Sequence, residues 1–204
     1  MRRLAIACLL VSTPAFADYL DDPTYSHKGQ VGLALSTGIG VSATVPYHST
    51  VYCGSSDSST MSGNAAVCTE RAPFGLDLAA SYGVASAAEI VLAFSFGFEH
   101  DFGAGPSTQG PIPIKLAPGV RFFFSDTGRG KLFVQPQLVF DFSSYKNTDG
   151  TSRGADFGVG ALEGYMFDFS TRFGAYAFLG ETIGFVRWLS GDFELGLGIQ
   201  ARYP

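Results

Sequence analysis

Apolar and polar side chains alternate strictly in the segment that precedes the final proline. A period of two predicts a β-strand with one apolar face. This face ends in an aromatic residue next to the C-terminus, and the opposite face carries glycine and charge, which is typical of a strand between lipid and a polar barrel interior. The segment therefore predicts the closing strand of a transmembrane β-barrel. Its apolar face consists of Phe193, Leu195, Leu197, Ile199, Ala201 and Tyr203.

The same alternation divides the rest of the chain into segments of strand length. We expect eight strands, near residues 29–45, 72–84, 89–102, 112–125, 131–143, 155–167, 172–185 and 192–203. Such a series predicts an all-β fold, an eight-stranded antiparallel up-and-down transmembrane β-barrel. Pro118 and Pro136 lie within neighbouring strands. Because a proline removes a ladder hydrogen bond, we expect bulges or weak pairing at both positions.

The connections between these strands alternate between short and long. Residues 85–88, 126–130 and 168–171 are short, whereas 46–71, 103–111 and 144–154 are longer and rich in Ser, Thr, Gly and Asn. Outer-membrane barrels have short periplasmic turns and longer extracellular loops. We therefore expect the short turns and the N-terminus in the periplasm and the long connections outside.

The composition favours a membrane barrel over a soluble one. Only 15% of the residues are charged, whereas charged residues make up about 25% of a typical soluble domain. A soluble barrel of the lipocalin type would carry charge on its outward face. Here the less apolar faces are mostly Gly, Ala, Ser and Gln, which suit a narrow barrel interior.

The N-terminus predicts export. A positively charged start, an apolar stretch at residues 4–11 and a small-residue pattern at 15–17 are typical of a secretory signal peptide. The expected division is a signal peptide at 1–17, cleaved after Ala17, a periplasmic segment at 18–28 and the barrel at 29–204. Loss of the two arginines in the signal peptide makes the formal charge more negative than −5, which disfavours nucleic-acid binding.

The signal peptide, the alternating turns and loops and the aromatic-ended strand 193–203 together resemble the small eight-stranded outer-membrane β-barrel proteins of Gram-negative bacteria, the outer-membrane protein A and X type. The resemblance covers the whole mature chain and implies insertion by the barrel assembly machinery. We expect a monomer in contact with outer-membrane lipid and lipopolysaccharide, without a cofactor. Pro204 departs from the family pattern, in which the aromatic residue usually ends the chain. The resemblance implies no reaction, because a fold does not determine function.

Cys53 and Cys68 are the only cysteines left after signal cleavage, and both lie in the first long connection. In an exported chain such a pair predicts a disulfide, and the chain-entropy model gives the closure of a loop of this length about 3 kcal/mol. A reactive or metal-binding pair is the alternative. The spacing of a zinc site is absent, because only His48 and Asp57 lie nearby, and we expect no metal.

Charged side chains on the less apolar faces predict a polar network inside the barrel. Charge in a narrow interior is costly unless it is paired, so we expect these residues to bind one another as a plug. A selectivity ring around an ion path is the alternative. The expected network is Asp77, Lys115, Arg121, Asp141, Glu163, Glu181, Glu194 and Arg202, with Gln135, Gln137 and Gln200.

The lipid-facing surface has one exception to its apolar pattern. Glu163 shares this face with Tyr165, so we expect a bulge near Gly160 to turn it inward to Arg121, with exposure to lipid as the alternative. Aromatic girdles are expected at both interfaces, and their candidates are Tyr82, Tyr165, Tyr176, Trp188 and Tyr203.

Some outer-membrane barrels modify lipid A with a His, a Ser and an acid. We expect His27 in the periplasm and His48 and His100 outside, so the three histidines cannot share one triad. The sequence therefore predicts a structural or surface-exposed role without catalysis. A narrow passive pore is the first alternative and a lipid A-modifying enzyme the second. The partner of the long loop at 46–71 is left open.

Overall fold

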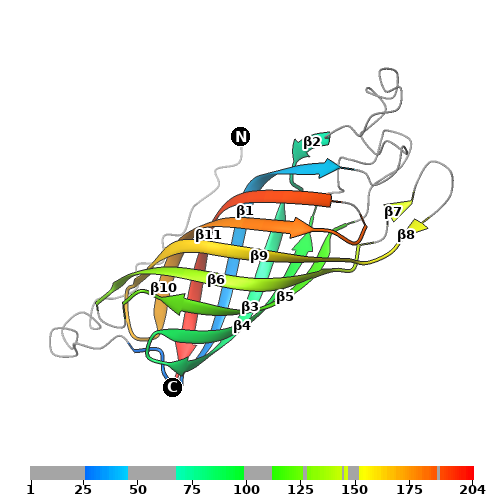
Figure 1. The fold of residues 1–204 in the computed structure, drawn as a ribbon. Coiled ribbons are helices and arrows are strands. Elements are labelled where there is room, and N and C mark those ends of the chain that lie inside the picture. The colour runs from blue at the N-terminus through cyan, green and yellow to red at the C-terminus, as the bar shows by residue number, and fades with distance from the viewer. Residues whose placement is uncertain are drawn as a thin grey trace, which may run out of the picture.

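A computed structural model of the protein describes residues 26–45, 68–98, 112–125, 128–143, 145–146, 152–187 and 189–204. Figure 1 shows a closed barrel of tilted strands. Its long strands are β1 (Val31–Val45), β3 (Gly75–Ala85), β4 (Ala88–Gly97), β5 (Ile114–Phe123), β6 (Gly130–Asp141), β9 (Asp156–Asp168), β10 (Phe173–Gly184) and β11 (Leu189–Tyr203). The short strands are β2 (Cys68–Arg71), β7 (Tyr145–Lys146) and β8 (Ser152–Arg153).

All neighbouring long strands pair antiparallel, in the order β11-β10-β9-β6-β5-β4-β3-β1, and β1 closes the barrel on β11. In this closing ladder Val31 pairs with Tyr203 and Val45 with Leu189, so the two strands are matched along their whole length. The predicted fold class, an eight-stranded antiparallel up-and-down barrel, is confirmed. Closure leaves no long strand edge unpaired, as lipid requires.

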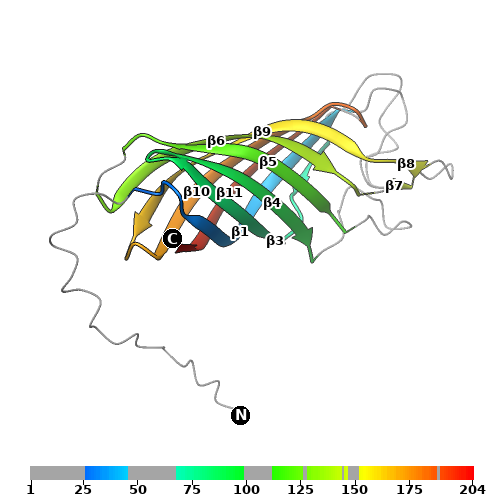
Figure 2. The same cartoon turned by 90° about the horizontal axis from the view of Figure 1, so that it is seen from below.

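The two ends of the barrel differ (Figures 1 and 2). Residues 86–87, 124–125, 128–129 and 169–172 and the C-terminus lie at what we call the turn end. At the opposite, loop end β1, β4, β6 and β10 end and β3, β5, β9 and β11 begin, and residues 46–67, 99–111 and 147–151 lie outside the described residues. β2 pairs with β1 at Val41 to Thr44, so part of the expected first loop, 46–71, is a strand.

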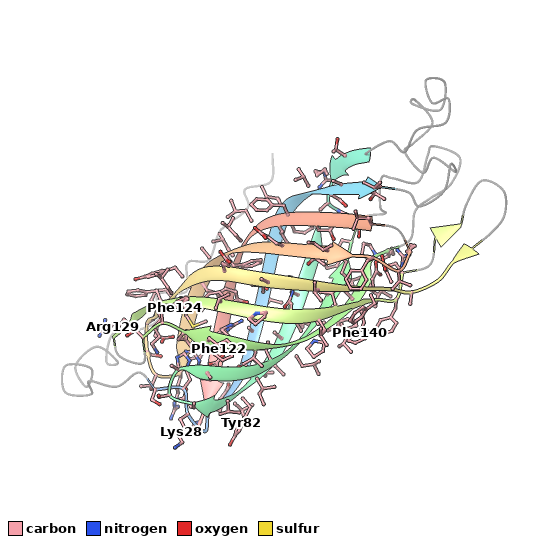
Figure 3. All side chains as sticks on the ribbon, in the orientation of Figure 1. Lys28, Tyr82, Phe122, Phe124, Arg129 and Phe140 are labelled. Atoms are coloured by element: carbon pink, nitrogen blue, oxygen red, sulfur yellow. The ribbon has the colours of Figure 1, made fainter. Side chains whose placement is uncertain are left out.

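Outward side chains on the long strands are mainly apolar. Figure 3 shows Tyr82, Phe122 and Phe124 on this surface, and Phe124 is 74% exposed. The apolar residues of the terminal strand face outward as well: Phe193, Leu195, Leu197, Ile199 and Tyr203. This surface has the composition that contact with lipid requires.

Pro118 and Pro136 weaken strand pairing without shifting it. The β5–β6 ladder keeps one register from Lys115 to Phe123 but lacks pairs at the two prolines. The expected weak pairing is therefore confirmed, whereas no bulge forms there. A register shift occurs instead between β3 and β4, next to Gly83.

Two residues that the sequence places inside the barrel face outward. β9 keeps a constant register with β6 and β10 through Gly160, so no bulge turns Glu163 inward and its side chain is exposed. Glu181 is exposed too, because the inward positions of β10 belong to residues such as Tyr176 and Phe178. The interior placement of both glutamates is wrong, and so is the placement of Tyr176 in an aromatic girdle.

Candidate functional site in the barrel lumen

The lumen has three levels, of which two are filled by side chains and the third is a cavity. At the turn end lies a group of buried charged and imidazole side chains, the turn-end cluster: His27, Glu89, Arg121, Lys131, Asp168 and Arg202. Next comes the aromatic layer, formed by Phe123, Phe133, Tyr176 and Phe178. Toward the loop end lies a cavity of about 190 Å³, the vestibule.

His27 enters the barrel from the segment that precedes β1. Gly29 adopts a positive φ of 78°, and its N–H donates to the Gly83 carbonyl at 2.7 Å, while the Gln30 N–H donates to the His27 carbonyl at 3.0 Å. A side chain at Gly83 would collide with the His27 carbonyl. The turn therefore holds the imidazole inside the turn end, where His27 is 2% exposed.

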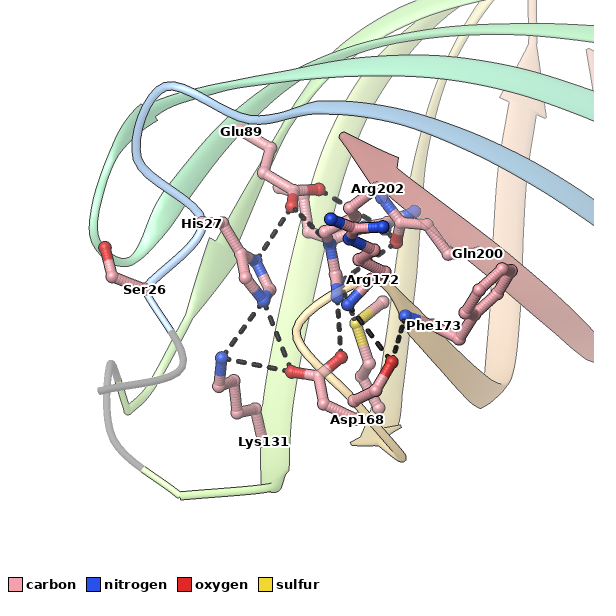
Figure 4. Close-up of polar contacts among 12 residues, drawn as sticks. Ser26, His27, Glu89, Lys131, Asp168, Arg172, Phe173, Gln200 and Arg202 are labelled. Carbon is pink, nitrogen blue, oxygen red and sulfur yellow. Dashed lines mark hydrogen bonds and ion pairs between the residues drawn. The ribbon is translucent and has the colours of Figure 1, made fainter. Parts of the chain in front are cut away.

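The His27 imidazole lies between two carboxylates and an ammonium group (Figure 4). Its Nδ1 is 2.8 Å from Glu89 Oε1, and its Nε2 is 3.0 Å from Lys131 Nζ and 3.3 Å from Asp168 Oδ2. An ammonium group only donates, so Lys131 is the donor in its contact with Nε2, while Nδ1 lies closest to the Glu89 carboxylate. The ring also makes an edge contact with Phe123, with 4.5 Å between centroids.

Arg202 and Lys131 balance the charge of the two carboxylates. Arg202 donates from Nη1 to Asp168 Oδ1 at 2.6 Å, and its Nε lies 3.5 Å from Glu89 Oε1. Lys131 Nζ lies 3.2 Å from Asp168 Oδ2. All four side chains are buried, so these carboxylates depend on protein cations and hydrogen bonds in place of water.

Arg121 connects the carboxylates to a row of amides. Its Nη1 lies 3.6 Å from Glu89 Oε2 and donates to Gln200 Oε1 at 3.1 Å, and its Nε donates to Gln135 Oε1 at 2.9 Å. The expected partner, Glu163, is on the outer surface of the barrel. The predicted Arg121–Glu163 pair is therefore wrong, and Glu89 is the acid that Arg121 faces.

Tyr176 and Phe178 of the aromatic layer line the vestibule beside Gln135, which accepts from Arg121, whereas the side chains of the turn-end cluster do not line it. Neighbouring rings lie 5.9 to 6.2 Å apart between centroids, and the Arg121 guanidinium lies 5.0 Å from the ring centroid of Phe133. Strand β11 leaves room for two of these rings, because side chains at Gly196 and Gly198 would collide with them. The interior is thus filled by large side chains here, as expected for a barrel of this size.

The vestibule is acidic and is bounded at its inner end by the aromatic layer. Lys115 Nζ lies 3.2 Å from Asp192 Oδ2, and the Ser42 hydroxyl donates to Asp192 Oδ1 at 2.7 Å. Glu194 lies against Gly38, where the absence of a side chain leaves space. Other charged residues that line the cavity are Asp77, Asp141, Asp156 and Arg187. No residue of the turn-end cluster lines it.

Arg187 and Asp156 order the rim at the loop end. Asp156 Oδ1 accepts the backbone N–H groups of Val186 and Arg187 at 2.9 and 3.1 Å. Arg187 donates from Nε to the Gly154 carbonyl at 3.0 Å and from Nη2 to the Ser143 carbonyl at 2.7 Å. These bonds tie the chain after β6, before β9 and after β10 to one another.

Most of the expected interior charges do line the lumen, namely Asp77, Lys115, Arg121, Asp141, Glu194 and Arg202. The predicted network lacks five buried residues of the lumen, namely His27, Glu89, Lys131, Asp168 and Arg187. The alternation contains the signal for Glu89 and Lys131, because they share faces with Val91 and Gln135. Asp168 lies one position beyond the predicted strand 155–167. His27 precedes the first strand, where periodicity gives no information.

Several predictions fall on parts of the chain that the structure does not describe. The signal peptide at 1–17, Cys53, His48, His100 and Trp188 lie outside the described residues, and of Cys68 only the backbone is described, in β2. The disulfide therefore stays a prediction. Within the described ranges, no group of three or more His, Cys, Asp or Glu side chains could hold a metal ion.

No known protein-family model and no curated protein matches the sequence. Solved structures do match. The N-terminal β-barrel domain of OprF from Pseudomonas aeruginosa has a TM-score of 0.55 at 13% identity, covering 86% of this chain and 98% of that chain. Neisserial surface protein A also has a TM-score of 0.55 at 13% identity, covering 86% of this chain and 98% of that chain. Ail, the attachment invasion locus protein of Yersinia pestis, has a TM-score of 0.50 at 12% identity, covering 85% and 99%.

Identities this low establish the architecture alone. The matched chains are aligned over almost their whole length, so the similarity concerns the complete barrel. This chain has the fold of the small eight-stranded outer-membrane β-barrels.

Proposed function

We propose that this chain is a bacterial outer-membrane protein whose barrel does not conduct ions and serves as a rigid scaffold for its loop-end connections. The observation that carries the proposal is the filled lumen. The turn-end cluster and the aromatic layer occupy the interior with large, mutually bonded side chains, and an eight-stranded barrel is only just wide enough for such a filling.

The outer-membrane location rests on three observations. The outward faces of the long strands are mainly apolar, the barrel is closed, and the sequence begins like a secretory signal peptide. Lipid and lipopolysaccharide would contact the outward faces, and the barrel assembly machinery would insert the chain. The turn end would then face the periplasm and the loop end the exterior. N-terminal sequencing of the mature protein should begin at Asp18.

The proposed role does not include catalysis. His27 is the one histidine within the described residues, and its described contacts are with Glu89, Lys131, Asp168 and Phe123. They include no Ser, Thr or Cys that an imidazole could activate. A narrow cation pore is the second candidate, and the acidic vestibule is the observation that favours it.

Single-channel recording in planar bilayers tests the proposal. Wild-type protein should show no current steps, because the vestibule ends at the aromatic layer. A triple variant, Arg121→Ala, Phe133→Ala and Phe178→Ala, removes inward side chains and should conduct, which shows that the assay detects an open lumen. The matched outward variant Phe124→Ala should stay silent. Steady current through the wild-type protein would support the pore, and a changed mass of lipid A after incubation would support an enzyme.

A further inference from the structure

Glu163 and Glu181 break the apolar pattern of the outer surface. Both side chains are exposed, and all other charged residues on the eight long strands point into the lumen or toward its ends. Within the described chain, neither carboxylate forms an ion pair or a hydrogen bond. A carboxylate on a lipid-facing surface costs free energy, and intramembrane acids in proteins normally have partners.

The two glutamates lie close enough to bind one group. In the β9–β10 ladder Glu181 is opposite Ala161, and Glu163 is opposite Leu179. The glutamates therefore occupy one diagonal of a four-residue square, where Cβ atoms are about 7–8 Å apart or somewhat less. The small Ala161 side chain leaves the space beside both carboxylates uncovered.

The square lies within the apolar band of the barrel. Aromatic residues lie on both sides of each glutamate along its strand, namely Phe157 and Phe167 on β9, and Phe173 and Phe185 at the two ends of β10. Aromatic girdles mark the interfaces between the membrane and water. Both carboxylates therefore lie between the aromatic positions that bound the apolar outer surface of their strands.

An apolar hollow adjoins this square. It is a shallow, open depression of about 530 Å³ whose outward-facing lining includes Tyr165, Ala175, Ala177, Leu197 and Ile199 and extends to Leu35 of β1 and Leu76 of β3. Tyr165 is the next outward residue after Glu163 on β9, and Ala177 is opposite Tyr165. The outer surface of β9, β10 and β11 thus combines paired acids with an adjoining apolar depression.

We propose that this face docks a second, membrane-embedded protein that places a lysine or arginine side chain over Ala161 and apolar side chains in the hollow. Charge complementarity selects this occupant. A second copy, related by a two-fold axis along the membrane normal, would bring equal charges together at equal depth, and its long strands offer no outward cation. The amine of a lipid headgroup lies at the membrane surface, outside the aromatic girdles.

Site-specific photo-crosslinking in intact outer membranes tests the proposal. A benzophenone amino acid replaces Ala161, and in a matched control it replaces Ala80, an outward alanine of β3. Position 161 should give a protein adduct that position 80 does not. The linked peptide should belong to a membrane-spanning segment with a basic residue. Adding Glu163→Gln and Glu181→Gln, which keep the shape and remove the charge, should lower the yield about tenfold or more.

Charge exchange then identifies the contact. Replacing the partner's basic residue by glutamate should abolish the adduct, and combining that change with Glu163→Lys and Glu181→Lys should restore it. Equal adducts at positions 161 and 80, an unchanged yield in the glutamine variant, an adduct to lipid or to a second copy, or a failed charge exchange would each overturn the proposal. A heat-modifiable band confirms that each variant assembles, and Glu181→Gln alone replaces any double variant that does not.

Discussion

Asp168 joins three other members of the turn-end cluster. It lies within 3.3 Å of His27, Lys131 and Arg202, and it is 1% exposed. Removal of one partner from a buried ion pair leaves the others without solvent or counter-charge. The cluster is therefore sensitive to single substitutions in a way that the exposed turn residues are not.

Asp168→Ala should lower the free energy of unfolding by roughly 3–5 kcal/mol, because it leaves two buried cations with one fewer carboxylate. Urea unfolding of the protein folded into lipid vesicles measures this change. Arg172→Ala, at an exposed position in the adjoining turn, serves as the control and should stay within about 0.5 kcal/mol of wild type. An equally small effect of Asp168→Ala would mean that the cluster is hydrated.

Arg121 shows what can and cannot be predicted about a single residue from the sequence. Alternation correctly predicts that Arg121 points inward, since its strand keeps a period of two. It does not predict that Arg121 faces Glu89 and not Glu163, because contacts across a lumen depend on the stagger between strands. Glu163 lies on the outward face of β9 with Tyr165, as the alternation of that strand requires, and it is exposed.

At the scale of elements, alternation predicts the long strands, and the prolines predict the weak pairing between β5 and β6, but neither predicts the short strands. The β1–β11 ladder joins the first and last strands, although β1 begins two residues after the predicted 29 and β11 three residues before the predicted 192. β2 pairs with the outer part of β1, but its four residues are too few to show a period. The same limit applies to the β7–β8 pair within the predicted loop 144–154.

The closing strand gives the prediction at this scale. Replacing Ile199 and Tyr203 by Asp puts charge on the lipid face of β11 and should abolish assembly into the outer membrane, because closure with β1 is what removes the open edge. The heat-modifiable band of the folded barrel reports the outcome. Ile199→Val with Tyr203→Phe is the conservative control. Normal membrane levels of the aspartate variant would show that assembly does not depend on this face.

At the scale of the whole molecule, the barrel followed from the sequence because each long strand repeats the same two-residue period. The filling of the lumen did not follow, because the inward faces that carry aromatic residues also carry glycine, as on β10, where Tyr176 and Phe178 lie between Gly174 and Gly180. The insertion of His27 also escapes prediction, since it comes from a turn outside the strands. Both features distinguish a barrel with a filled lumen from a barrel with an open lumen.

The first long connection supplies a separate prediction for the exported protein. Cys53 and Cys68 should form a disulfide, so the denatured, unreduced mature protein should contain no free thiol, and Cys53→Ser should expose one. Alkylation followed by mass spectrometry counts the thiols. Two alkylatable thiols in freshly isolated outer membranes would contradict the bond.

The closure of the lumen is the central claim, and hydrogen exchange of the arginine side chains measures it most directly. In NMR spectra of the protein in lipid nanodiscs, the Nε–H groups of Arg121 and Arg202 should exchange slowly with water, because both guanidinium groups are buried among the acids and amides of the turn-end cluster. Arg172, which is exposed at the same end, provides the fast internal reference. Exchange of Arg121 and Arg202 as fast as that of Arg172 would show that water freely reaches the turn-end cluster and would contradict the account.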